Sequence, residues 1–192
     1  MKKILAILLG LIIVVGCDNG RKSLILGTVN NSDLNGKWIF LVPVFYEDSL
    51  GVDSVVIENN KFYFERNEEF LADIRVDYHY RQNTENLLVV TEPGTINVKI
   101  DTVSCGCGTP QNDSLQVWKD LIIKLKAELN KTRSDLNYFV RVGDTANALI
   151  VKRHMEVVNE KFQNRTKNMA ENFGSGTLYE FLMQRVTKQN QK

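Results

Sequence analysis

The sequence predicts an α+β protein in which an N-terminal antiparallel β-sandwich precedes a helical hairpin and a short last helix. The hydrophobic pattern has a period of two up to about residue 111 and follows helical spacing from residue 112 onward. Turn-forming pairs separate about seven short alternating segments, as expected of a sandwich or an open barrel. With 192 residues and 43% hydrophobic content, the chain is long enough to bury a substantial core.

Residues 1–16 resemble an export signal and are set apart from the fold. A basic start is followed by an apolar run from Ile4 to Val15, which is too short for a membrane span of about 20 residues. Gly16 and Cys17 end this run and resemble the lipobox of bacterial lipoproteins. The resemblance implies cleavage before Cys17 and a diacylglyceryl group on its thiol, so that several acyl chains hold the protein on a membrane.

The lipoprotein interpretation places the protein in the envelope of a Gram-negative bacterium, on the outer membrane or facing the periplasm. The mature chain would start at Cys17, with residues 17–22 as a polar tether. Cleavage removes two lysines and leaves 22 basic and 23 acidic residues, a formal charge of −1. This balance argues against nucleic-acid binding, which needs a basic face. A plain secretory signal or an uncleaved anchor is the alternative interpretation.

The sandwich is expected over residues 23–111, where apolar and polar residues alternate between turn signals. Pro43 places the second strand at a sheet edge or a bulge. Asn59-Asn60 suits a tight hairpin because asparagine tolerates positive φ, and Pro93-Gly94 predicts a further turn. The expected strands span residues 23–30, 37–46, 54–58, 61–65, 72–80, 87–91 and 95–101.

Residues 112–187 are expected to form helices. Asp113 or Ser114 is placed to cap the first helix, and Asp144 follows the break at Gly143 and can cap the second. Two apolar stripes of matched length predict an antiparallel helical hairpin. The stripes comprise Leu115, Trp118, Ile122, Leu125, Leu129, Leu136 and Phe139, then Ala148, Val151, Met155, Val158, Phe162, Met169 and Phe173.

A short last helix is expected after Gly174 and Gly176, which end the second long helix. Thr177 and Glu180 form the signature of a capping box at its start. The polar residues 188–192 are expected to fray.

Several strand and turn motifs share their order and spacing with a known family. They are Asp53-Ser54, Ile57, Lys61-Phe62, Phe64, Glu92-Pro93-Gly94, Ile96, Val98, Val103-Ser104, Gly108-Thr109, Asn112 and Leu115. Together they resemble domain of unknown function 4369, over about residues 23–118. This resemblance implies a β-sandwich of the kind that precedes a thioredoxin-like domain in exported thiol-disulfide oxidoreductases of the AhpC/TSA class. The helical segment to Met183 is similar to the linker region of those proteins.

The sequence departs from the family pattern at three points. Asn60 stands where the family commonly has glycine, and Cys105-Gly106-Cys107 is an insertion. No Trp-Cys-x-x-Cys motif occurs in the chain, so the resemblance does not extend to the redox activity of a thioredoxin domain. We therefore expect a free-standing module that lacks that domain.

Cys105 and Cys107 are the candidate residues for thiol chemistry. In an oxidising envelope they could form a strained bond across one residue, of the kind a disulfide donor or isomerase uses. The favoured interpretation is a surface loop with inert thiols or a static bond, because no nearby His or Lys in the sequence activates them. A zinc site is disfavoured because His79 and His154, the two histidines, lie on different predicted elements.

The leading expectation is a non-enzymatic binding module without metal or cofactor, held on a membrane through Cys17. Its partner would be a separate thioredoxin-like or other envelope protein, and an apolar patch on the helices would favour this function. Thiol-disulfide exchange through Cys105 and Cys107 is the first alternative. The second is a surface lipoprotein that binds a glycan or peptide on an exposed aromatic face. The aromatic residues of that face would be Tyr46, Tyr63, Tyr78 and Tyr80.

Overall fold

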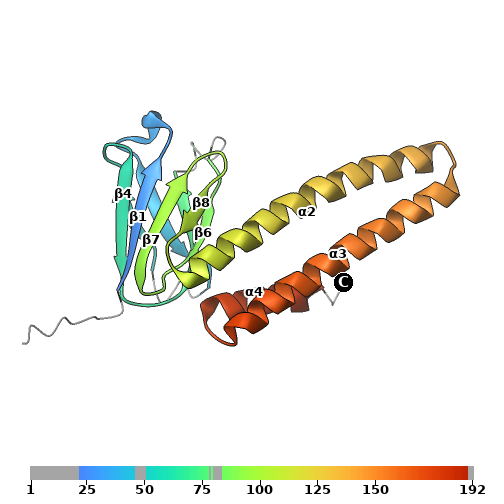
Figure 1. Cartoon of the computed structure of the whole chain (residues 1–192). Helices are drawn as coiled ribbons and strands as arrows, with labels where there is room; N and C mark the ends of the chain where they lie inside the picture. The colour runs from blue at the N-terminus through green and yellow to red at the C-terminus, as the bar shows by residue number, and fades with distance from the viewer. Residues whose placement is uncertain (1–21, 46–50, 78, 80–83, 190–192) are drawn as a thin grey trace, which may run out of the picture.

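The computed structural model describes residues 22–45, 51–77, 79 and 84–189. It confirms the predicted α+β class, with two four-stranded sheets followed by three helices (Figure 1). Cys17 and the predicted export signal lie outside the described residues.

Sheet A has the strand order β4-β1-β7-β8, and sheet B has the order β3-β2-β5-β6. The pairing of β1 with β7 is parallel, and all other neighbouring strands in the two sheets are antiparallel. The strands are β1 Ser23–Val29, β2 Trp38–Pro43, β3 Asp53–Val56, β4 Lys61–Arg66, β5 Leu71–Val76, β6 Leu87–Val90, β7 Gly94–Ile100 and β8 Cys105–Cys107.

Strand β8 and a short 3-10 helix, Ser32–Leu34, were not predicted. A three-residue strand is too short to show a period of two, and its central residue, Gly106, has no side chain. The strand forms because the turn after β7 brings it into antiparallel register, with Cys105 opposite Lys99 and Cys107 opposite Asn97. The inserted cysteines therefore form an edge strand and do not lie in a loop.

Strands β3 and β4 are joined by the predicted Asn-Asn turn but belong to different sheets. Asn59 and Asn60 have φ angles of 51° and 60°, the left-handed conformation that asparagine tolerates. The Asn60 N–H donates a 2.7 Å hydrogen bond to Oδ1 of Asn35 and holds the turn against the loop before β2. This hairpin consequently connects the two sheets along one side of the sandwich.

Alternate residues of both sheets point into a continuous apolar core between them. Gly27 lies on the inner face of β1 directly opposite Phe62 of β4. A Cβ atom at Gly27 would be 2.0 Å from Cζ of Phe62, so the Phe62 ring occupies the space that a side chain would fill.

The helices are α2 Pro110–Arg141, α3 Thr145–Phe173 and α4 Thr177–Gln189. Helices α2 and α3 form the predicted antiparallel hairpin, which projects away from the sandwich (Figure 1). Asp144 caps α3 as expected, and its carboxylate accepts a 3.1 Å hydrogen bond from the Asn147 N–H. None of the described helices is long and apolar enough to cross a membrane.

Two predicted helix caps are wrong. Helix α2 begins at Pro110, before Asp113 and Ser114, because the fixed φ of proline is preorganised for the first helical turn. Thr177 is already helical, and its hydroxyl donates a 3.0 Å hydrogen bond to Glu69 of the sandwich. Thr177, expected from the sequence to cap α4, thus connects the helical segment to the sandwich.

A second core joins the helices to the outer face of sheet B. Leu71 and Val90 of that sheet pack with Leu115 and Trp118 of α2 and with Phe181 of α4. The buried Asn112 side chain accepts from the Val90 N–H at 2.9 Å and donates to the Val90 carbonyl at 2.8 Å. These bonds extend the edge of β6 onto α2. Helix α4 packs on the outer face of sheet B, so it does not cover the outer face of sheet A.

Candidate functional site

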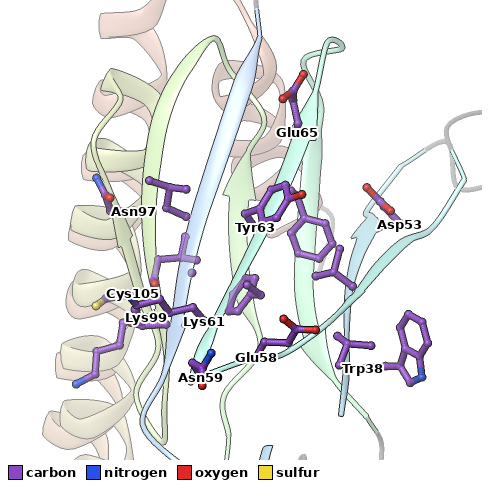
Figure 2. Close-up of a pocket in the computed structure, with 18 of the residues that line it drawn as sticks. Trp38, Asp53, Glu58, Asn59, Lys61, Tyr63, Glu65, Asn97, Lys99 and Cys105 are labelled. Atoms are coloured by element: carbon purple, nitrogen blue, oxygen red, sulfur yellow. Dashed lines mark hydrogen bonds between the residues drawn. The ribbon is translucent and has the colours of Figure 1, made fainter. Parts of the chain in front are cut away.

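A groove of about 1300 Å³ opens on the outer face of sheet A and continues past β4 to β3 and Trp38 of β2 (Figure 2). The register of sheet A aligns its outward side chains in two rows that cross all four strands. The first row contains Tyr63, Leu26, Asn97 and Cys107, and the second contains Lys61, Thr28, Lys99 and Cys105. Each row therefore runs from an exposed residue of β4 to a thiol on β8.

Three large side chains of the groove are exposed to solvent. Tyr63 is 64% exposed, Leu26 is 42% exposed and Trp38 is 49% exposed. Aromatic rings at such positions offer large contact areas at a low cost in conformational entropy. The surface of the groove is thus amphipathic, with polar and charged side chains between these three large residues.

Among the strands that the structure describes, β4 pairs with β1 alone and forms an edge of sheet A beside the groove. The Val29 N–H donates to the Asn60 carbonyl at 3.0 Å, which fixes the alternation of hydrogen-bonded pairs between β1 and β4. In antiparallel pairing the residues between those pairs direct their N–H and C=O groups away from the partner strand. Tyr63 and Glu65 therefore direct their main-chain groups to the free edge of β4.

Ion pairs frame this edge. Glu65 pairs with Lys22 at 2.6 Å, and Arg66 of β4 lies 3.6 Å from Asp53 of β3. The Arg66–Asp53 pair joins β4 to β3, so among the described residues the stretch of β4 available to an added strand lies between the Asn-Asn turn and Arg66. Figure 2 shows Tyr63 and Glu65 on β4, with Asp53 and Trp38 on the other side of the opening.

The two thiols at the far end of the groove are free and exposed. They share one face of an extended strand, where residues two apart are separated by about 6.6 Å. Their side chains project in parallel from the strand, whereas a disulfide brings its Cβ atoms to roughly 3.5–4.5 Å, so a bond between Cys105 and Cys107 requires β8 to distort.

The expectation that no lysine lies near the thiols is wrong. Lys99 is the cross-strand partner of Cys105, and Lys119 of α2 is near enough for the Cys105 charge to act on it. Burial lowers the pKa of Lys119, while the charges of Glu85 and Cys105 oppose this shift. Its Nζ donates a 2.8 Å hydrogen bond to the Ser104 carbonyl, which directs the ammonium to the main chain beside β8.

We expect both thiols of the folded protein to be alkylated completely by iodoacetamide, without a bond forming between them under mild oxidation. Pairing with β7 keeps them apart, whereas the unfolded chain is free to close the bond. Mass spectrometry of samples oxidised with and without urea measures this difference. A reversible Cys105–Cys107 bond in the native protein, formed without loss of thermal stability, would contradict the assigned role of β8.

The other candidate residues do not join this site. His79 lies 3.0 Å from Asp77, and His154 of α3 lies 3.2 Å from Glu128 of α2. Among the residues that the structure describes, no group of three or more His, Cys, Asp or Glu side chains is arranged to hold a metal. Of the four predicted tyrosines, Tyr63 lies in the groove, and Tyr46, Tyr78 and Tyr80 lie outside the described residues.

Sequence reasoning missed Trp38 and the free edge of β4 as parts of the site. Trp38 begins a predicted strand, but nothing in the local pattern shows that its ring is exposed beside β3. The edge depends on the pairing order of the sheet, which cannot be read from a single alternating segment.

A comparison with known families adds to this geometry. Residues 24–115 match the domain of unknown function DUF4369. This part of the chain is a DUF4369 domain. The match extends from β1 into the first turns of α2, so the groove lies within the DUF4369 domain and most of the helical hairpin lies beyond it. No curated protein and no solved structure matches the chain significantly.

Proposed function

We propose that this protein is a non-catalytic binding module of the cell envelope, anchored by a lipid on Cys17. Its DUF4369 domain binds an extended polypeptide segment of an envelope partner in the groove of sheet A. The observation that carries this proposal is the free edge of β4, which borders a groove with exposed aromatic side chains.

The chemistry of the groove favours a polypeptide ligand. An extended segment that adds to β4 would pair its main chain with the free N–H and C=O groups of Tyr63 and Glu65. Its alternate side chains would meet Tyr63 and Leu26 on the face of sheet A, and Trp38 across the opening. Main-chain pairing supplies affinity in such complexes, and the side-chain contacts supply specificity.

We expect Glu65→Pro to weaken partner binding and to leave the fold intact. Proline removes the N–H at position 65, which points to the free edge, and proline is tolerated on edge strands for this reason. A photoreactive residue at position 38 reports binding in intact cells, because its crosslinks fall across the groove. We expect the crosslinked product to fall at least about tenfold, the equivalent of a single lost main-chain hydrogen bond.

Glu65→Ala is the matched control, since it removes the carboxylate that pairs with Lys22 and keeps the N–H. A photoreactive residue at Lys124, an exposed position on α2, controls for chance encounters. Equal crosslinking in the proline and alanine variants would refute strand addition at β4. Crosslinking that is as strong from position 124 as from position 38 would move the binding surface to the helices.

Thiol-disulfide exchange is the second candidate function. It is favoured by the exposure of Cys105 and Cys107 at the end of the groove and by the proximity of Lys99 and Lys119. Exposure leaves both sulfur atoms accessible to a disulfide of a partner protein. A mixed disulfide with the partner, trapped in a Cys107→Ser variant and lost in Cys105→Ser, would support this function.

A further inference from the structure

The turn between α2 and α3 carries exposed apolar side chains at the far end of the hairpin. We call residues 131–153 the hairpin tip. Five of its large apolar residues are between 53% and 66% exposed, namely Tyr138, Val140, Val142, Leu149 and Ile150. They lie on both sides of the turn and outside the apolar stripes along which α2 and α3 pack.

The hairpin tip is also basic. It contains five exposed basic residues and two acidic residues, a formal charge of +3, whereas the whole chain carries +1. One of the two acidic residues, Asp144, is engaged in capping α3. The basic residues are Lys131, Arg133, Arg141, Lys152 and Arg153. Positive charge is therefore concentrated where the apolar side chains are exposed.

The hairpin tip lies far from the sandwich, so that an extended surface such as a membrane can approach it. Helix α2 has 32 residues, which corresponds to about 48 Å at a rise of ~1.5 Å per residue. Figure 1 shows the turn at the end of the hairpin that points away from the sandwich. The sandwich therefore does not obstruct an approach to the tip.

We propose that the hairpin tip binds an anionic membrane surface. Apolar side chains at a turn can enter the boundary between headgroups and acyl chains, while the surrounding Lys and Arg side chains meet lipid phosphates. Like charges disfavour a contact between two tips, so charge complementarity favours an anionic lipid surface over a second copy of this chain. This contact does not depend on a lipid at Cys17 or on the groove.

The test uses residues 18–192, which retain both buried cores and lack the residue proposed to be acylated. Co-sedimentation compares vesicles of phosphatidylglycerol and phosphatidylethanolamine with vesicles of phosphatidylcholine. We expect binding to the anionic vesicles that weakens as salt is raised. Both Val142→Glu/Ile150→Glu and Lys152→Glu/Arg153→Glu should weaken it at least about tenfold.

Two controls lie on the same hairpin outside the tip. Val157→Glu introduces a charge at an exposed apolar residue of α3, and Lys124→Glu reverses an exposed charge of α2. Both should retain vesicle binding, and circular dichroism confirms that every variant keeps its helices.

Four results would overturn the proposal. One is the absence of binding to anionic vesicles at low salt, and another is binding that the tip variants leave unchanged. The third is a protein that does not bind vesicles but forms a concentration-dependent dimer, which Val142→Glu/Ile150→Glu abolishes. That result would show that the tip binds a second copy of the chain. An acidic protein that binds the tip in place of vesicles would overturn it in the same way.

Discussion

Replacement of Trp118 by alanine is expected to lower the free energy of unfolding by about 3–5 kcal/mol, as for other buried tryptophans. The Trp118 ring lies 5.1 Å from the ring of Phe181 in an edge-to-face arrangement and 6.5 Å from the ring of Phe162. Its indole N–H donates a 3.2 Å hydrogen bond to the buried hydroxyl of Thr166. The substitution thus leaves a cavity where α2, α3 and α4 meet.

Urea denaturation followed by circular dichroism measures the loss, and Trp118→Phe is the control. Phenylalanine keeps most of the ring contacts and loses the N–H donor, so it should cost about 1–3 kcal/mol. Hydrogen exchange should accelerate more in α4 than in β1, because Trp118 belongs to the core between helices and sandwich. Equal acceleration in both elements would show that the two cores unfold as one unit.

Gly27→Val is expected to destabilise the sandwich by about 3 kcal/mol, at the upper end of overpacking effects. The new Cβ would lie 2.0–2.3 Å from three atoms of the Phe62 ring, so that ring must leave its position. Phe62 is also edge-to-face with Phe64 at 5.8 Å, and the displacement therefore spreads into the core. Thermal unfolding of the variant measures the effect.

A double-mutant cycle identifies the cause. Phe62→Leu shortens the side chain opposite position 27, so the double variant should be more stable than the sum of the single effects predicts. Additive losses would show that the valine acts on the strand itself and not through the Phe62 ring.

Sequence patterns predicted those parts of the fold that repeat over many residues. Seven strands and the hairpin of α2 and α3 follow from alternation and helical spacing, and Asn59-Asn60 forms the expected turn. Strand β8 was missed because three residues carry no period. The parallel pairing of β1 with β7 was missed because sheet order depends on contacts between distant segments.

The candidate site was predicted only in part for the same reason. Tyr63, Cys105 and Cys107 were identified as residues, but the two rows that join them depend on the register of four strands. Lys119 reaches the neighbourhood of Cys105 from α2, and the sequence distance between them conceals that proximity. The exposed side chains of the hairpin tip lie outside the two apolar stripes that form the helical seam, which a hydrophobic count alone does not show.

Hydrogen exchange of the complex with the crosslinked partner tests the proposed binding mode most directly. Strand addition predicts that the amides of Tyr63 and Glu65, which face the free edge of β4, exchange more slowly in the complex. The amides of β6, which forms the edge of sheet B farthest from β3, should exchange at the same rate in the free protein and in the complex. Slower exchange confined to α2 and α3, with β4 unchanged, would contradict binding in the groove and place the partner on the helices.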